Sequence, residues 1–360
     1  MNKVYFPGLN GIRAIAALIV LIFHIDLALP AFGLKEIGIH KNNMAGYGVT
    51  MFFVLSGYLI TSLLLYEKSY TGTISIKNFY IRRILRIWPL YYLAIIIALL
   101  LLFAGFISLD KHQFFLFYLF FIPNVAFVLK MTILPIVPLW SVGVEEQFYA
   151  FWPWLIKYSR NLYKVFLCVI IVYFILKLIA RFSNMIFYEL VYITTFDCMA
   201  IGSIGALLAM EKNNSMYFKV IYNKYCQILA WLVLLFSCIY KPIHIFSFID
   251  QEVNALVYLI LILNVSRNPK TIISLENKFF DFIGKISYGI YVYHFIIIVI
   301  LSNLIKNKLP DNYLGYTLIF LIIIGSTILV SYFSYKYFEK RFLNQKVRFS
   351  SIISKHARNE

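Results

Sequence analysis

An arginine and a histidine lie on one face of the first apolar segment of this sequence. Arg13 and His24 are eleven residues apart, which in an α-helix is about three turns, or about 16 Å along one face. A neutral imidazole can act as a general base, and a guanidinium can hold an anion. Taken singly, His24 could be bonded to a backbone carbonyl and Arg13 could be a surface anchor. Together they indicate one cavity in which a substrate could contact both.

The segment 140–149 carries two adjacent carboxylates. Ser141 and Glu145 are four residues apart and share a helical face, whereas Glu146 is turned by about 100°. We therefore expect Glu145 to face the interior and Glu146 to be peripheral. Glu145 and His24 should lie at a similar depth, where the carboxylate could orient an imidazole base. The same pair could relay protons in a transporter, and these residues do not separate the two interpretations.

Three arginines follow the second apolar segment, in what the sequence indicates is a loop. Arg83 and Arg86 are three residues apart and share a helical face, with Arg82 beside them and Pro89 just beyond. Two guanidinium groups on one face suit a phosphate-bearing ligand. A basic flank of a membrane span would have the same composition, so the pattern alone favours a phosphate site only modestly.

The remaining polar residues give weaker signals. Asp197 and His294 are isolated within apolar segments, and we expect them to make structural hydrogen bonds. The four cysteines have no metal-type spacing and are expected to be buried thiols. Four histidines in loops or near the end of the chain also lack ligand spacing: His40, His112, His244 and His356. The sequence therefore predicts no metal site.

Composition identifies the elements that must position these residues. Hydrophobic residues make up 62% of the 360 and charged residues 14%, and the mean hydropathy is +0.80, values typical of a membrane protein. The net charge is +17, but Lys and Arg occur in short clusters between apolar runs. Such clusters set topology and contact anionic lipid headgroups, so we expect membrane lipids and no nucleic acid as partners.

Apolar periodicity predicts an all-α, polytopic integral membrane bundle of about ten transmembrane helices. Ten spans with the N-terminus inside place most of the 33 basic residues in the cytoplasm, whereas an eleventh span at 113–130 would place most of them outside. We therefore expect 113–130 to be re-entrant or interfacial and both termini to be cytoplasmic. Residues 1–345 would form one transmembrane domain and 346–360 a basic cytoplasmic tail. The predicted spans are 10–29, 47–66, 88–107, 140–156, 165–181, 190–210, 227–241, 252–265, 287–305 and 314–335.

At these residues the sequence resembles the membrane-bound acyltransferase family 3, the O-acetyltransferases of bacterial surface polysaccharides. The resemblance runs from Tyr5 to about Phe342, and it departs from the family where Glu339 is followed by Lys340 instead of proline. Six motifs occur in order: Leu9–Ala17 with His24, Phe52–Ile60, Arg83 and Arg86 with Pro89 and Tyr91, Trp140–Tyr149, Phe196 and Asp197 with Gly202, and Ser287–His294.

The resemblance implies a multi-pass enzyme of the bacterial cytoplasmic (inner) membrane. Acetyl-CoA, or another acyl-CoA, would be a co-substrate on the cytoplasmic side, with no tightly bound cofactor. The acceptor would be a hydroxyl of a carbohydrate or lipid-linked glycan on the outer side. The residues expected to act are His24 and Glu145 in catalysis, Arg13, Arg82, Arg83 and Arg86 in acyl-CoA binding, and Ser141, Tyr149, Asp197 and His294 in support.

Two other functions are compatible with the same residues. A proton-coupled exporter of lipid-linked sugar precursors would use His24 and Glu145 as its relay and would need no CoA. A catalytically silent membrane partner in glycan assembly would bind CoA without turnover. The acceptor stays open among a sugar, a lipid carbohydrate, peptidoglycan and a small glycoside.

Overall fold

The computed structural model describes residues 2–38, 44–108, 115–211, 216–240, 245–246, 248–350 and 352–355. His40, His112, His244 and His356 lie outside these ranges. The elements in chain order are β1 Asn2–Tyr5, α1 Leu9–Ala28, η1 Leu29–Phe32, α2 Met44–Thr71, α3 Ile76–Phe103, α4 Phe115–Leu119, α5 Pro123–Val128, η4 Leu134–Ile136, α6 Leu139–Tyr158, α7 Leu162–Ala180, α8 Met185–Ile193, α9 Phe196–Met210, α10 Met216–Ile221, α11 Lys224–Ile239, α12 Asp250–Arg267, α13 Lys278–Ile305, α14 Tyr313–Ser334, the π-turn η5 Tyr335–Glu339, α15 Lys340–Lys346, η6 Val347–Phe349 and β2 Ile352–Lys355.

The helical class and the multi-pass character predicted from the sequence are confirmed. Within the described residues, seven helical stretches are long and apolar enough to cross a membrane. The helices α6, α11 and α12 fall outside that criterion, and the total of ten spans and the cytoplasmic termini stay predictions. The seven stretches are Leu9–Phe32, Met44–Thr71, Ile76–Phe103, Leu162–Ala180, Met185–Met210, Lys278–Ile305 and Tyr313–Phe349.

The segment predicted to be re-entrant or interfacial contains two short helices, α4 and α5. They have 5 and 6 residues, which is far less than the roughly 20 residues that a span requires. The side chain of Tyr91 on α3 donates to the carbonyl of Tyr118, and Gln147 on α6 donates to the carbonyl of Phe121. This segment therefore folds back against α3 and α6, although residues 113 and 114 lie outside the described ranges.

Two boundaries differ from those predicted. The arginine cluster lies within α3 and not in a loop, because Ser75 caps that helix by accepting a hydrogen bond from the backbone N–H of Asn78, and α3 begins at Ile76. The first turns of α3 are basic, and the helix continues without a break into its apolar part. A run of uncharged residues predicts only that apolar part. The predicted span 190–210 is divided into α8 and α9 at Thr194 and Thr195.

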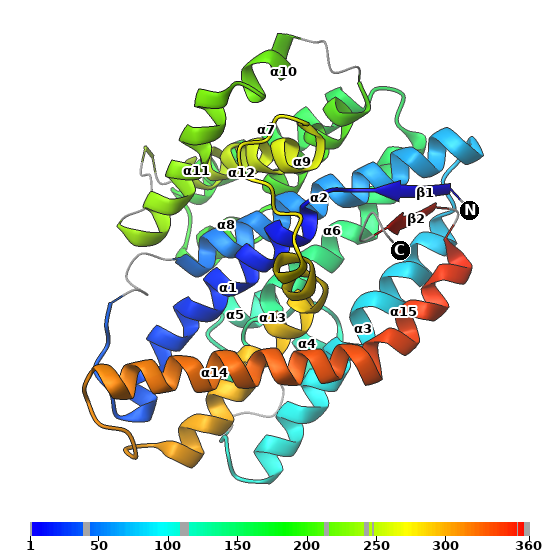
Figure 1. Ribbon diagram of the computed structural model, residues 1–360. Helices are drawn as coiled ribbons and strands as arrows, with labels where there is room; N and C mark the ends of the chain where they lie inside the picture. Colours follow the sequence, from blue (N-terminus) through cyan, green and yellow to red (C-terminus); the bar gives the residue numbers. More distant parts are fainter. Residues whose placement is uncertain are drawn as a thin grey trace.

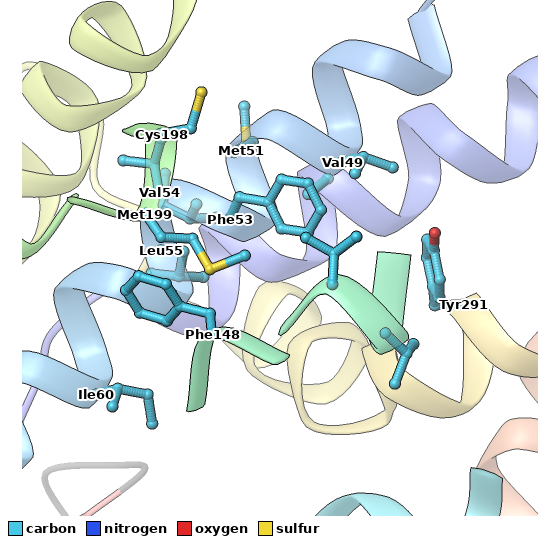
Figure 2. Packing of buried hydrophobic residues seen from close by; sticks show 14 of the residues in the cluster. Val49, Met51, Phe53, Val54, Leu55, Ile60, Phe148, Cys198, Met199 and Tyr291 are labelled. Carbon is cyan, nitrogen blue, oxygen red and sulfur yellow. The ribbon is translucent and has the colours of Figure 1, made fainter. Parts of the chain in front are cut away.

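Close packing of α2 against α9 forms the centre of the bundle (Figure 1). A Cβ atom added to Gly57 would lie 1.9 Å from the carbonyl oxygen of Met199, and one added to Gly202 would lie 2.0 Å from that of Val54. Figure 2 shows Val54 of α2 beside Met199 of α9 in this core. Glycines allow two helix backbones to approach closely, which is how helices gain packing energy in lipid.

A buried ion cluster joins α7, α9 and α12. The ammonium group of Lys177 donates to Asp197 at 2.7 Å, to Glu252 at 2.8 Å and to the side-chain oxygen of Gln251 at 3.3 Å. Both Lys177 and Asp197 have 0% exposed side chains. The structural role predicted for Asp197 is therefore supported, and its partner is a lysine that the sequence analysis did not single out. Of the cysteines, Cys198 is buried in this region, whereas Cys168 on α7 is exposed, contrary to expectation.

The two ends of the described chain meet beside α3. Strands β1 and β2 pair in parallel, with Asn2 opposite Ile352, and α15 lies along α3 (Figure 1). This short ladder is an addition to the all-α prediction. Part of the predicted tail, residues 352–355, is thus tied to the N-terminus, while 351 and 356–360 lie outside the described residues.

Breaking the buried pair should destabilise the bundle. We expect Asp197→Ala or Lys177→Met to cost about 3–5 kcal/mol, because each leaves a charge without its main partner in a low-dielectric interior. The measurement is thermal unfolding of purified protein in detergent. The control is Lys130→Met, which removes an ion pair with Glu189 whose side chains are 71% and 28% exposed and should cost less than about 1 kcal/mol. Equal unfolding temperatures for all variants would contradict a structural role for the cluster.

Candidate active site

A cavity of about 110 Å³ lies between α1, α2, α3, α6 and α13. We call it the arginine cavity, because three guanidinium groups reach it from α1 and α3, and we call the corresponding end of the bundle the arginine end. One carboxylate accompanies them, so the ionised side chains around the cavity carry a net positive charge. Its polar lining consists of Arg13, Ser56, Arg83, Arg86, Ser141, Glu145, Tyr149, Ser287, Tyr288 and Tyr291.

The arginines of this cavity are held by contacts that leave hydrogen-bonding capacity unused. Arg13 donates to Asn10 at 2.9 Å, and Asn10 donates in turn to Asp281 at 2.7 Å. The guanidinium of Arg83 lies 5.4 Å from the ring centre of Tyr149, in a cation–π arrangement. Its Nε atom is buried and has no hydrogen-bond partner within the described part of the chain. Buried N–H donors of this kind favour a bound anion.

Arg82, which was grouped with these residues in the sequence analysis, lies elsewhere. It forms an ion pair with Glu67 at 2.7 Å and donates to the carbonyl oxygen of Phe349 at 2.8 Å. The guanidinium group therefore connects α3 to α2 and to the C-terminal segment. It does not line the arginine cavity, and its part in acyl-CoA binding stays a prediction.

Glu145 faces the arginine cavity, as its spacing from Ser141 predicts. Its two carboxylate oxygens accept hydrogen bonds from Ser56 at 3.0 Å and from Tyr149 at 2.7 Å. Glu146 turns toward α3, where it accepts a hydrogen bond from the indole of Trp88 at 2.9 Å, and it does not line the cavity. The two hydroxyl donors therefore hold the carboxyl group of Glu145 in a fixed position beside the arginines.

A second cavity, of about 410 Å³, lies at the opposite end of the bundle, which we call the histidine end. His24 lines this cavity and not the arginine cavity. The expected contact between His24 and Glu145 is therefore wrong: the two side chains belong to different cavities. We call the second one the aromatic cavity, after its ring-bearing lining of Phe23, Phe53, Phe127, Trp140, Tyr192, Tyr291 and Phe295.

The partner of His24 is His294 of α13. Nδ1 of His24 lies 2.9 Å from the carbonyl oxygen of Val20 and 3.1 Å from Nε2 of His294. Because a carbonyl oxygen only accepts, Nδ1 of His24 carries the proton and Nε2 carries a lone pair. Nδ1 of His294 likewise lies 3.2 Å from the carbonyl oxygen of Ile290, so its Nε2 is bare and shares the single Nδ1 proton of His24 with the carbonyl oxygen of Val20. Backbone geometry thus sets both tautomers and leaves His24 Nε2 as a base.

Tyr291 separates the two cavities and lines both. Its hydroxyl lies 2.6 Å from that of Ser141 and donates to the carbonyl oxygen of Pro138 at 3.1 Å. Tyr291 and Ser56 were not predicted as site residues, although they lie within the motifs 287–294 and 52–60. A signal for Tyr291 was present, since it precedes His294 by three residues and so shares its helical face.

This chain is similar to known proteins over most of its length. A family model described as an acyltransferase domain matches residues 6–336. The "Putative O-acetyltransferase SACOL0978" of Staphylococcus aureus (strain COL) is 28% identical over 393 residues, covering 96% of this chain and 58% of that protein. The O-acetyltransferase OatA of Staphylococcus aureus (strain NCTC 8325 / PS 47) is 27% identical, covering 93% of this chain and 57% of OatA. The chain thus spans less than two thirds of the length of these relatives. No solved structure matches it.

The histidine tautomers can be tested directly. We expect nitrogen-15 magnetic resonance of histidine-labelled protein at neutral pH to show His24 protonated at Nδ1 and bare at Nε2, because Val20 accepts from Nδ1. Comparison with His24→Gln assigns the signal. A signal from His24 with the proton on Nε2 would overturn its assignment as a base that faces the aromatic cavity.

Proposed function

The chain belongs to the acyltransferase family whose model covers residues 6–336, and on that basis we propose that it is a membrane-bound O-acyltransferase. It transfers acetyl from acetyl-CoA, bound at the arginine end, to a hydroxyl of a glycan or lipid-linked sugar at the histidine end. The observation that carries the proposal is the pair of cavities separated by Tyr291: one is cationic, and the other contains a histidine base.

The arginine cavity supports the donor half of this proposal. Arg83 and Arg86 lie near the start of α3 with Arg13 near the start of α1, so the phosphates of CoA would meet guanidinium groups at the entrance. The cavity is too small for a nucleotide, which favours entry of the thioester arm alone. Glu145, held by Ser56 and Tyr149, belongs to this donor half and positions the arginines by its charge.

The aromatic cavity supports the acceptor half. His24 Nε2 takes the proton of the acceptor hydroxyl as its oxygen attacks the thioester carbon, and the bond from carbon to sulfur breaks. The leaving thiolate takes a proton, which His24 returns, so the base is regenerated. His294 accepts from Nδ1 of His24 and steadies the imidazolium while it exists. We expected Glu145 to orient His24, and we now assign that orienting role to His294.

Charge supports the orientation in the membrane that we propose. The arginine end also carries Lys278 and Lys285 at the start of α13 and Lys340 at the start of α15, and basic residues are retained in the cytoplasm. Acetyl-CoA would thus be met on the cytoplasmic side of a bacterial inner membrane. The exporter hypothesis required a direct relay between His24 and Glu145, and their separation removes the observation that favoured it.

Removing the paired guanidinium groups should abolish donor binding. We expect Arg83→Ala/Arg86→Ala to weaken acetyl-CoA binding at least about 100-fold, because each charge-assisted hydrogen bond contributes roughly 1.5–3 kcal/mol. The measurement is calorimetric titration of purified protein. Lys130→Ala, which changes a cation remote from the cavity, is the control. Unchanged affinity in the double variant would count against a donor site at the arginine end.

Removing the base should abolish transfer and spare donor binding. We expect His24→Ala to lower acetyl transfer about 10²–10⁴-fold, the usual contribution of a general base, while calorimetry shows unchanged acetyl-CoA affinity. Transfer is measured as acetylation of surface glycans in cells that carry either form as their sole copy. Acetylation at the wild-type level in the variant would exclude this role.

A further inference from the structure

The aromatic cavity has a buried hydroxyl group with no partner. Thr195 lies between α8 and α9, and its side chain lines the cavity with only 2% of the residue exposed. Its Oγ1 atom makes no hydrogen bond to any residue that the structure describes. An unsatisfied buried hydroxyl is costly unless a ligand or water completes it. Thr195 therefore marks a position at which a polar atom of a ligand is expected.

Aromatic rings form much of the lining of the same cavity. Trp140 lies with its ring centre 5.4 Å from that of Phe127, at an interplanar angle of 31°, and 6.3 Å from that of Phe53. A ligand with an apolar face and a polar edge would place the face on Trp140 and the edge toward Thr195 and His24. A pyranose ring has this form, because its C–H groups gather on one face and its hydroxyls on the rim. A hydrocarbon chain would leave Thr195 unsatisfied.

Charge restricts the ligand further. The described lining of the cavity contains no lysine, arginine, aspartate or glutamate. Among the described residues, two ammonium groups lie behind lining rings, and both are already paired. Lys177, 5.7 Å from the ring centre of Tyr192, donates to Asp197, Glu252 and Gln251. Lys130, 6.0 Å from the ring centre of Phe127, pairs with Glu189 at 2.9 Å. Glu252 also retains a buried oxygen without a hydrogen-bond partner among the described residues. An anionic ligand would find no unpaired counter-charge in the described lining.

We propose that the aromatic cavity is the acceptor subsite and selects an uncharged sugar ring, with Trp140 as the stacking platform and Thr195 as the hydroxyl partner. This rests on the proposed function, and it adds the residues that bind the acceptor and the charge that the acceptor must have. The volume of about 410 Å³ falls in the range of roughly 300–1,000 Å³ that small-molecule sites occupy.

The experiment compares two probes that differ in one group, methyl glucoside and methyl glucuronide. Binding to the purified full chain is measured by calorimetry, and acetyl transfer to each probe from acetyl-CoA is measured by mass spectrometry. We expect the neutral glycoside to bind at least about tenfold more tightly than the glucuronide, because a carboxylate loses its hydration in this cavity without gaining a counter-charge. Equal or tighter binding of the glucuronide would overturn the selection for uncharged rings.

Three variants test the residues. Trp140→Ala should weaken the binding of methyl glucoside about tenfold, whereas Trp140→Phe should retain most of that affinity. Thr195→Val should weaken the binding of methyl glucoside roughly threefold to tenfold. The affinity for acetyl-CoA should be unchanged in all three variants. The matched control is Thr327→Val, because Thr327 is also buried without a partner but lies on α14, outside both cavities. Unchanged glucoside affinity in both Trp140→Ala and Thr195→Val, or equal competition by a long-chain alcohol, would overturn the subsite.

The two proposals fail in different ways. Glucoside binding that depends on Trp140 and Thr195 without acetyl transfer to any acceptor would reject the proposed function and leave the subsite. Acetyl transfer with acceptor binding insensitive to both residues would reject the subsite and leave the proposed function.

Discussion

Every polar group that this chain carries into the membrane must find its partner within the protein, because lipid supplies none. The described structure meets this constraint by pairing. Lys177 is saturated by three acceptors, Arg82 is bound by Glu67 and a carbonyl oxygen, and the carboxylate of Glu145 accepts from two hydroxyls. Ten buried side-chain atoms nevertheless have no partner among the described residues. Two of them, Arg83 Nε and Thr195 Oγ1, belong to residues that line the two cavities at which we place substrates.

The two cavities divide the chemistry by charge. Guanidinium groups surround the arginine cavity, whereas aromatic rings and neutral polar groups surround the one that contains His24. Under the proposed function, a polyanionic donor and a neutral acceptor therefore prefer opposite ends of the same bundle. Tyr291, bonded to Ser141 and to the carbonyl of Pro138, is the partition across which they must meet. A reaction across a membrane requires such a division, because water and ions must not follow the acyl group.

Sequence patterns predicted features that depend on one helix and missed those that depend on two. The shared face of Ser141 and Glu145 follows from a spacing of four, and the non-crossing segment around Pro123 follows from loop charge; both agree with the structure. The pairing of His24 depends on which helices are neighbours. Depth alone suggested Glu145, but the helix packed beside α1 is α13, which brings His294 instead. The buried ion pair of Lys177 was not predicted for the same reason, because its partners lie on α9 and α12.

The parallel pairing of residues 2–5 with 352–355 has a consequence for biosynthesis. Strand β1 emerges from the ribosome long before β2 does, so this contact forms only after residues 352–355 have been synthesised. Until then the start of α1, which carries Arg13, and the side of α3 that Phe349 meets lack their final neighbours. Under the proposed function, the region where the phosphorylated donor enters therefore reaches its final structure only after β2 has been made, so a nascent chain that stops before β2 cannot consume cellular thioester.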